Sequence, residues 1–263
     1  MRKIFLWAVV VFLFFSSGCG GGDASKEVSP KPSAQETSEI DAGKKSIDVS
    51  TVGLIKGRVL FEGDAPAPKA ISVKGNPECA ILHPGGNVMS EELLAKDGGL
   101  GNVFMYVKEG LEGYTFETPK EPVTIENNAC VYAPHVAGAQ VNQEIIFLNK
   151  DNTLHNIHSY PKTNKAFNLG LPLVGMKQTK KFAAAEIMVP MKCDVHPWML
   201  GYIGVLSHPC FAVTDVTGNF ELKNLPPGEY LIEAWHEKLG VQSQRVKIEP
   251  KSEEQVEFRF KSA

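Results

Sequence analysis

The sequence has little charge imbalance, few cysteines and almost no helical periodicity. Its 263 residues carry a formal net charge of −3 without any block of basic residues, so binding to nucleic acid is not expected. No internal repeat of fixed period is present, and neither a Ser-His-Asp arrangement nor a glycine-rich phosphate loop is evident. These absences favour one or two β-rich domains without an enzymatic activity.

Long hydrophobic runs are also missing, apart from a short one at the N-terminus. Two basic residues precede the apolar residues 4–15, and small residues then lead to Cys19. This pattern is typical of a secretion signal, and the run is too short for a comfortable membrane span. The Gly-Cys ending resembles a bacterial lipobox, so we interpret residues 1–19 as a signal peptide with lipidation at Cys19. A plain cleaved signal and an uncleaved anchor are the alternatives.

The lipobox resemblance implies an exported protein on the periplasmic side of a bacterial membrane. The residue after the lipidated cysteine is Gly20 rather than Asp, which favours the outer membrane. Residues 20–50 are rich in Gly, Ser, Lys, Glu and Pro and have almost no aromatics. Such a segment cannot bury enough apolar surface to order itself. We predict a disordered linker that holds the folded part on the order of 30 Å from its anchor.

The rest of the chain shows the pattern of short β-strands. Residues 54–61 alternate apolar and polar side chains, and residues 103–107 form a second strand candidate. Between them we expect an irregular stretch with a helical turn around residues 91–94. Turn residues recur between the later apolar segments as well. The sequence therefore predicts an all-β fold of the sandwich type.

The densest group of metal-binding side chains lies late in the chain. Cys193, His196 and Met199 occupy positions i, i+3 and i+6 of one loop, and Pro197 biases His196 away from helical dihedrals. A thiolate, an imidazole and a thioether are three of the four groups used by soft-ligand copper sites, which combine two His and one Cys with a weak axial Met. The second imidazole must come from elsewhere. His155, in a run that follows an apolar strand-like segment, is the candidate.

The Cys-x-x-His-x-x-Met loop and the sequence His-Asn-x-His at 155–158 resemble the copper segments of cupredoxins, most closely those of amicyanin. The resemblance implies a Greek-key β-sandwich over residues 119–208 that holds one type 1 copper ion. It assigns the ligand role to the histidine followed by Asn, hence to His155 rather than His158. It also implies that Asn156 joins the two ligand loops through hydrogen bonds.

The segments on either side of residues 119–208 resemble a second family. Residues 214–222 and 225–230 read Thr-Asp-x-x-Gly-x-Phe-x-Leu and Leu-Pro-Pro-Gly-x-Tyr. This pattern resembles the carboxypeptidase regulatory-like family of transthyretin-type β-sandwiches. We therefore expect residues 51–118 and 209–263 to form such a sandwich, with the cupredoxin inserted in it or, as the alternative, packed beside it as a tandem domain.

Three cysteines belong neither to the lipid signal nor to the copper loop. An exported protein can form disulfides, and Cys79 with Cys130 is the preferred pair, which leaves Cys210 unplaced. As an alternative, Cys79 and Cys130 bind zinc together with His83 and His135. The spacing of these four residues matches no common zinc pattern, and an oxidising compartment disfavours the arrangement.

The sequence thus predicts a type 1 copper protein that carries single electrons between redox protein partners. Its ligands are His155, Cys193, His196 and Met199, which leave no open coordination position for a substrate, so no enzyme is expected. Two other functions stay open. One is copper storage or delivery without electron transfer, and the other is a surface β-sandwich that acts as a binding module.

The cupredoxin resemblance further implies an apolar patch near His196 that docks redox partners. Pro197 and Trp198, together with Leu171 and Pro172, are the candidates for this patch. Packing of Trp198 into the core is the alternative.

Overall fold

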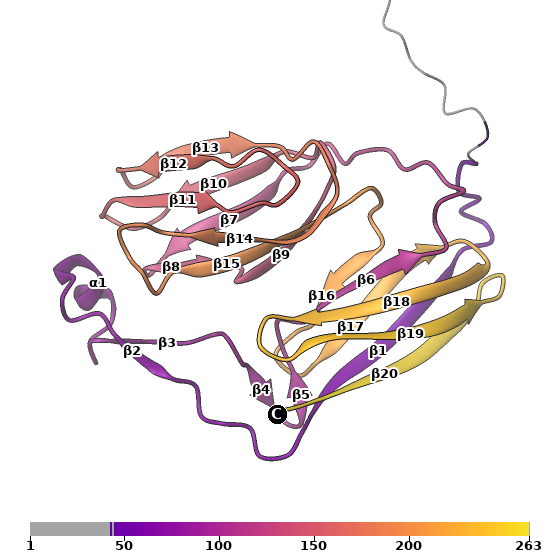
Figure 1. The fold of residues 1–263 in the computed structure, drawn as a ribbon, viewed down its shortest axis with the longest axis horizontal. Helices are drawn as coiled ribbons and strands as arrows, with labels where there is room; N and C mark the ends of the chain where they lie inside the picture. Colours follow the sequence, from indigo (N-terminus) through magenta and orange to yellow (C-terminus); the bar gives the residue numbers. More distant parts are fainter. Residues whose placement is uncertain (1–42, 44, 263) are drawn as a thin grey trace, which may run out of the picture. The chain divides into compact units, whose positions relative to one another are not determined.

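The computed structural model describes residue 43 and residues 45–262. These residues form β-strands with one short helix between them, and the strands assemble into two β-sandwiches and a small ribbon (Figure 1). The prediction of an all-β chain is confirmed.

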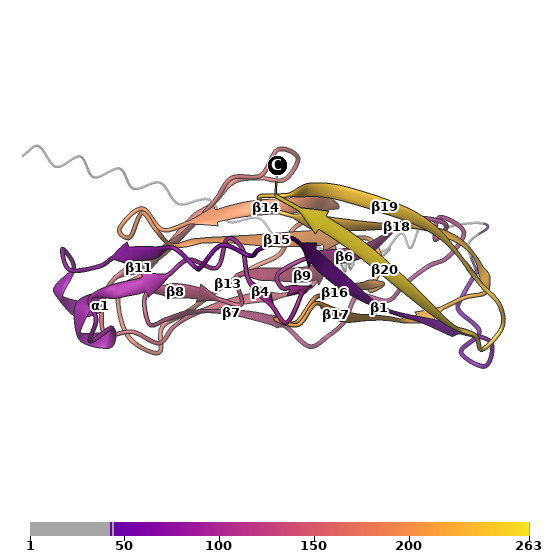
Figure 2. The same ribbon diagram turned by 90° about the horizontal axis from the view of Figure 1, so that it is seen from below.

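One sandwich, called the flanking sandwich below, contains the first and last strands of the chain. Its first sheet has the order β17-β1-β5-β4, and β20 pairs with β1 in parallel (Figure 2). Its second sheet has the order β16-β6-β18-β19. The two sheets share one apolar core. The strands are β1 (Gly53–Glu62), β4 (Ala95–Lys96), β5 (Gly99–Leu100), β6 (Phe104–Glu109), β16 (Phe211–Val213), β17 (Asn219–Leu225), β18 (Gly228–His236), β19 (Gly240–Ile248) and β20 (Glu253–Lys261).

The other sandwich, called the inner sandwich, uses the middle of the chain. Its sheets have the orders β13-β10-β7-β8 and β12-β11-β14-β15-β9. A separate apolar core lies between them. The strands are β7 (Val123–Asn128), β8 (Val131–Ala133), β9 (Val136–Gln140), β10 (Ile145–Asn149), β11 (His155–Ser159), β12 (Asn168–Leu171), β13 (Lys177–Lys180), β14 (Glu186–Lys192) and β15 (Leu200–Leu206).

The inner sandwich is inserted between two neighbouring strands of the flanking sandwich. β6 and β16 pair antiparallel, with Met105 opposite Ala212, although all of β7–β15 lies between them in the sequence. The chain therefore enters and leaves the inner sandwich at adjacent positions. The domain boundaries 51–118, 119–208 and 209–263 stay predictions, as does the likeness of the flanking sandwich to the carboxypeptidase regulatory-like family.

The alternation of side chains explains which strand faces are buried. In β20, Val256, Phe258 and Phe260 are buried and the residues between them are exposed or half-exposed. In β10, Ile145 and Phe147 are fully buried in the same alternating manner. Successive side chains of a strand point to opposite faces. One face of each strand therefore builds the core and the other meets solvent.

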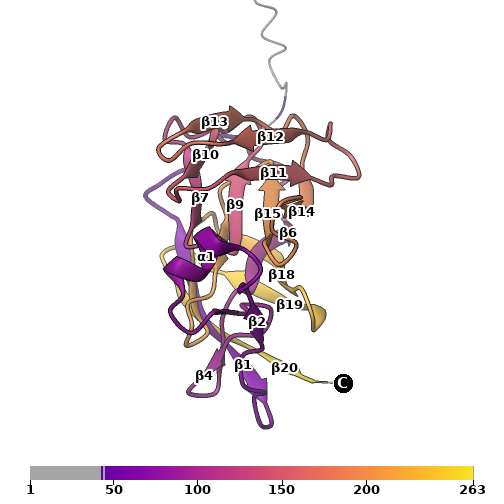
Figure 3. The same cartoon turned by 90° about the vertical axis from the view of Figure 1, so that its left-hand side faces the viewer.

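Between β1 and β4 the chain forms an extended arm, defined here as residues 69–90. The arm contains β2 (Ala70–Ser72), helix α1 (Pro77–Leu82) and β3 (Asn87–Met89), and α1 lies at one end of the inner sandwich (Figures 1 and 3). The prediction of a helical turn around residues 91–94 is wrong, since those residues form bends. The helix begins instead at a proline, whose fixed φ and missing N–H suit the first helical position.

The predicted signal peptide, the lipidation at Cys19 and most of the predicted linker 20–50 lie outside the described residues. The linker ends earlier than expected, because Lys45 is already paired with the connection between β6 and β7. Its N–H donates to the Gly113 carbonyl at 2.9 Å, and its own carbonyl accepts from the Thr115 N–H at 3.1 Å. Within the described part of the chain, no helix has the length and apolar character needed to cross a membrane.

Gly57 of β1 provides a test of the packing in the flanking sandwich. A Cβ atom at Gly57 would lie 2.4 Å from the Val256 carbonyl oxygen and 2.6 Å from the Phe220 ring. We expect Gly57→Ala to lower the free energy of unfolding by about 1–3 kcal/mol, because the strand or the ring must move. The control is Gly113→Ala, where nothing lies within 4 Å of the added Cβ. Thermal unfolding measures both, and equal stabilities would contradict this account of the packing.

Candidate metal centre

The predicted ligands come from one strand and from the loop between β14 and β15, at the same end of the inner sandwich. His155 begins β11, Cys193 directly follows β14, and His196 and Met199 lie in the loop before β15. His155, Cys193 and His196 are 0%, 3% and 2% exposed, and Met199 is buried with them. The donors are thus carried on or next to strands and are shielded from water.

One nitrogen of each imidazole and the Cys193 sulfur converge on a common point. Nδ1 of His196 lies 3.0 Å from Nδ1 of His155 and 3.7 Å from Sγ of Cys193. The three donor atoms lie within 4.8 Å of one another. Met199 closes the loop through its backbone, because its N–H donates to the His196 carbonyl at 2.9 Å and its carbonyl accepts from the Cys193 N–H at 3.2 Å.

The strand alternation separates the two histidines of β11. His155, Ile157 and Ser159 are fully buried, whereas His158 points to the opposite face of the strand. There, Nδ1 of His158 lies 3.1 Å from the Asp194 carboxylate, which is itself largely exposed. The structure therefore brings His155 to the centre and places His158 outside it.

Asp151 binds His155 through Nε2, the ring nitrogen that is not directed at the other donors. Its Oδ2 accepts hydrogen bonds from Nε2 of His155 at 3.0 Å and from the Cys130 N–H at 2.8 Å, and its Oδ1 accepts from the Ala129 N–H at 2.7 Å. Burial pushes the pKa of Asp151 upward, but these hydrogen bonds outweigh burial and lower it below its ordinary value. The sequence analysis assigned no role to Asp151, although it stands four residues before His155 in the same loop.

The bond to Asp151 sets the tautomer of His155. Because the carboxylate accepts from Nε2–H, the Nδ1 lone pair is free to face the centre. Burial tends to lower the pKa of His155, but the Asp151 carboxylate and the Cys193 sulfur on its two sides raise it above the ordinary value. The surroundings of His155 therefore favour a positive charge at the centre.

The pKa of Cys193 is shifted downward, which also favours binding of a metal ion. Burial raises the pKa of the thiol, but its interactions with the His155 and His196 rings and with the Asn156 and His196 backbone lower it to about 6. A thiol with this pKa is largely a thiolate at neutral pH, and the thiolate is the form that binds metals.

Asn156 joins the two ligand segments. Its Oδ1 accepts from the Asp194 N–H at 2.8 Å and lies 3.3 Å from Sγ of Cys193. Its Nδ2 donates to Asn168 at 2.7 Å and to the Asp194 carboxylate at 2.9 Å. The Tyr132 hydroxyl donates to the backbone carbonyl of Asn156 at 2.6 Å, a contact that has no local signal in the sequence. Asn156 therefore restrains the position of the Cys193 loop relative to β11.

The expected apolar docking patch is only partly exposed. Leu171 is fully buried, so its assignment to the patch is wrong, whereas Pro172 and Pro197 are exposed. Trp198 is half-buried, and its indole N–H donates to the Cys130 carbonyl at 2.9 Å. Trp198 also packs against the cluster that contains Val73, Cys79 and Val88 of the arm, so it does not stand free on the surface.

The remaining cysteines differ in state. Cys79 of α1 and Cys130 form a disulfide, so neither sulfur is available as a zinc ligand. His83 bonds to a backbone carbonyl at 2.8 Å and His135 pairs with a glutamate, and the four-residue zinc alternative is therefore wrong. Cys210 is a buried free thiol in the core of the flanking sandwich, where burial raises its pKa to about 12.

The donor set fits a copper ion. Metal bonds to imidazole nitrogen and thiolate sulfur are about 2.0 and 2.3 Å long. Two such nitrogens can then be at most about 4 Å apart, and a nitrogen and a sulfur about 4.3 Å. The observed separations of 3.0 and 3.7 Å lie within these limits. Two imidazoles and one thiolate are also the donors that soft copper sites prefer.

Comparison with known proteins gives partial matches only. No family model and no curated protein matches the chain. A copper-containing nitrite reductase from Thermus scotoductus is 20% identical over 37% of this chain and 24% of its own, with a TM-score of 0.31. A purple cupredoxin from Nitrosopumilus maritimus is 25% identical over 32% and 98%, with a TM-score of 0.27. A proline-to-alanine mutant of amicyanin in its oxidized state is 17% identical over 32% and 81%, with a TM-score of 0.30.

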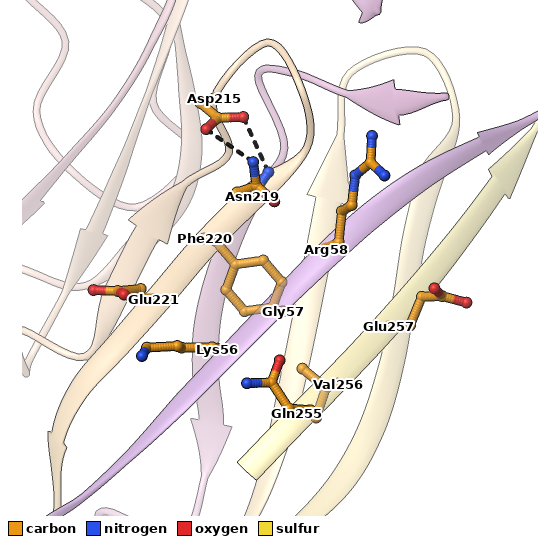
Figure 4. A pocket seen from close by; sticks show the side chains of 10 residues that line it. All are labelled: Lys56, Gly57, Arg58, Asp215, Asn219, Phe220, Glu221, Gln255, Val256 and Glu257. Carbon is orange, nitrogen blue, oxygen red and sulfur yellow. Dashed lines mark hydrogen bonds between the residues drawn. The ribbon is translucent and has the colours of Figure 1, made fainter. Parts of the chain in front are cut away.

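A hollow lies on the flanking sandwich, away from the metal centre. It has a volume of about 810 Å³ and is formed by β1, β17 and β20 with the turn before β17 (Figure 4). Basic side chains of Lys56 and Arg58 and acidic side chains of Glu221 and Glu257 line it. None of the predicted metal ligands lies on these strands. The hollow is open and of mixed charge, and its surroundings do not point to a particular chemistry.

Asp151→Asn tests the support of His155. The amide keeps one oxygen, so at least one of the three donors to Asp151 loses its partner. We expect the free energy of unfolding to fall by about 1–3 kcal/mol and copper affinity to fall by about 10–100-fold. Asp97→Asn makes the same chemical change at an exposed position and should alter neither. Thermal unfolding and copper titration against a competing chelator measure the two effects. Unchanged affinity would contradict the role given to Asp151.

Proposed function

We propose that this chain is a type 1 copper protein that carries single electrons between redox protein partners. The observation that carries the proposal is the buried convergence of the His155 and His196 Nδ1 atoms with the Cys193 sulfur. These are the equatorial donors of such a site, and Met199 in the same loop is the axial donor.

When bound, copper supplies a one-electron couple between Cu(II) and Cu(I). The chain contributes by holding its donors in place. Asp151 orients the His155 ring, and Asn156 ties the Cys193 loop to β11. Donors fixed by such hydrogen bonds cannot rearrange freely. The positions therefore stay similar in both oxidation states, which favours rapid electron transfer.

The arrangement favours a carrier over an enzyme. The three equatorial donors are almost completely buried, and Met199, buried in the same loop, is the proposed axial donor. A catalytic metal site instead keeps a position open for water or substrate. The proposed partners are other redox proteins, with exposed Pro172 and Pro197 in the region where they would dock.

We further propose that the protein is exported and anchored by a lipid on Cys19, on the periplasmic side of a bacterial outer membrane. The N-terminal pattern of residues 1–19 motivates this proposal. The disulfide between Cys79 and Cys130 supports it, because disulfides persist in oxidising compartments. Residues 20–50 would then act as a tether between the anchor and the folded part.

Two other functions remain as alternatives. Copper storage or delivery uses the same ligands, and it would be recognised by ready transfer of copper to an acceptor with slow electron exchange. A binding function of the flanking sandwich is favoured by the hollow of about 810 Å³ on β1, β17 and β20. It would be recognised by binding of glycans or cell-wall material to a metal-free preparation.

The visible spectrum of the copper-loaded protein tests the ligand set. We expect an intense thiolate-to-copper charge-transfer band that ascorbate bleaches and an oxidant restores. Cys193→Ser should abolish the band, because serine offers no thiolate. The matched control is Cys210→Ser, which removes another buried thiol, in the core of the flanking sandwich, and should leave the band intact. An intense band in Cys193→Ser would overturn the proposal.

The axial role of Met199 has a separate test. Met199→Leu keeps the volume of this buried side chain but removes its weak sulfur donor. We expect the charge-transfer band to persist and the reduction potential to rise, because a lost donor destabilises Cu(II) more than Cu(I). Cyclic voltammetry measures the potential. An unchanged potential would mean that Met199 serves only in packing.

A further inference from the structure

The Cys79–Cys130 disulfide lies against the outer side of the metal centre. Both of its sulfurs and a ring nitrogen of His196 lie within 4.8 Å of one another, and so do the Cys130 sulfur and donor atoms of Asp151 and His155. Cys79 and Cys130 are both 0% exposed. α1 therefore lies against the His196 side of the ligand pair.

Apart from the disulfide, few contacts hold the arm there: a ring nitrogen of His83 bonds to the Ala129 carbonyl at 2.8 Å, and Val131 and Trp198 pack against the small cluster beneath it. Its ribbon has three residue pairs, and Cys79 is the buried residue of α1, whereas Ile81 is 79% exposed. The cluster beneath the arm contains, besides the two cysteines, only Val73 and Val88 as fully buried members. A partly open hollow of about 160 Å³ lies beside β3 and Trp198. A segment with so few buried contacts opens easily once its cross-link is gone.

Building on the proposed copper function, we propose that this disulfide is a redox-operated latch that keeps the arm over His196 and limits electron exchange with the centre. A dithiol reductant opens it. The reductant's two sulfurs form a new S–S bond, and the bond between Cys79 and Cys130 breaks. Two electrons and two protons pass to the cysteine sulfurs, each of which becomes a thiol. The arm then moves off and exposes the edge of the His196 ring.

The metal ligands themselves do not depend on the latch. The carboxylate of Asp151 accepts from the backbone N–H groups of Ala129 and Cys130, not from the cysteine side chain. Asn156 restrains the Cys193 loop from the other strand. Opening of the arm therefore leaves the four ligands in place, and the effect of reduction is on access rather than on coordination.

Hydrogen exchange of the copper-free protein tests the movement of the arm without reference to its copper chemistry. We expect reduction by tris(2-carboxyethyl)phosphine to speed exchange of the α1 amides by about tenfold or more, with β11 and β15 unchanged. The double variant Cys79→Ser/Cys130→Ser should show the same exchange without reductant. Cys210→Ser should behave as the unmodified chain does in both states. Equal protection of α1 in the oxidised and reduced forms would overturn the latch.

Stopped-flow oxidation of the Cu(I) form by hexacyanoferrate(III) tests the effect on access. Ascorbate prepares Cu(I) protein with the disulfide intact, and the phosphine, removed before mixing, prepares it with two thiols. We expect the dithiol form and the double serine variant to react several-fold faster than the disulfide form. Equal rates, with thiol counts verifying reduction, would overturn the latch. Failure of the dithiol form to regain the charge-transfer band after oxidation by hexacyanoferrate(III) would also overturn it, because the freed thiols would then have captured the copper. Absence of the band from both oxidised forms would refute the copper function instead.

Discussion

The metal centre depends on one buried carboxylate. The Asp151 side chain is 3% exposed, and a buried charge is costly unless hydrogen bonds compensate it. Its three donors come from two segments, the turn at 129–130 and His155, while its own N–H donates to the side chain of Asn149 at 2.9 Å. If either segment moved, the carboxylate would lose a partner. The position of the first ligand and the position of the disulfide turn are therefore linked by a single side chain.

Antiparallel pairing then brings the other ligands to the same place. β11 and β14 run in opposite directions, with His158 opposite Lys192. The start of β11 and the end of β14 consequently lie at the same end of the sheet. His155 stands at that start, and Cys193 follows that end directly. The loop to β15 returns at once, because β14 and β15 also pair antiparallel. Ligands far apart in sequence thus meet without any long connection.

The sequence was sufficient for features with a local pattern. Strand alternation predicts the sandwiches, and the short loop around Cys193 predicts a group of donor side chains, of which Cys193 and His196 do lie together. The sequence was not sufficient for contacts between residues that lie far apart in the chain. The donors to Asp151 at Ala129 and Cys130 stand 22 and 21 residues before it, so its acidic side chain looked like any other in a loop. The surroundings of Trp198 depend on where the arm lies, and no periodic pattern in the sequence predicts the position of the arm. The sequence therefore allows two interpretations of Trp198, exposure in a docking patch or packing into the core.

The flanking sandwich explains how the arm and the ligands meet. Both the arm, between β1 and β4, and the inner sandwich, between β6 and β16, are insertions into this one scaffold. β6 and β16 pair with each other, and β1 and β4 belong to one sheet with β5 between them, so the scaffold's core remains continuous. The disulfide joins the two insertions, with Cys79 in one and Cys130 in the other. The scaffold thereby brings the arm, which neither sheet of the inner sandwich contains, against His196 of the candidate centre.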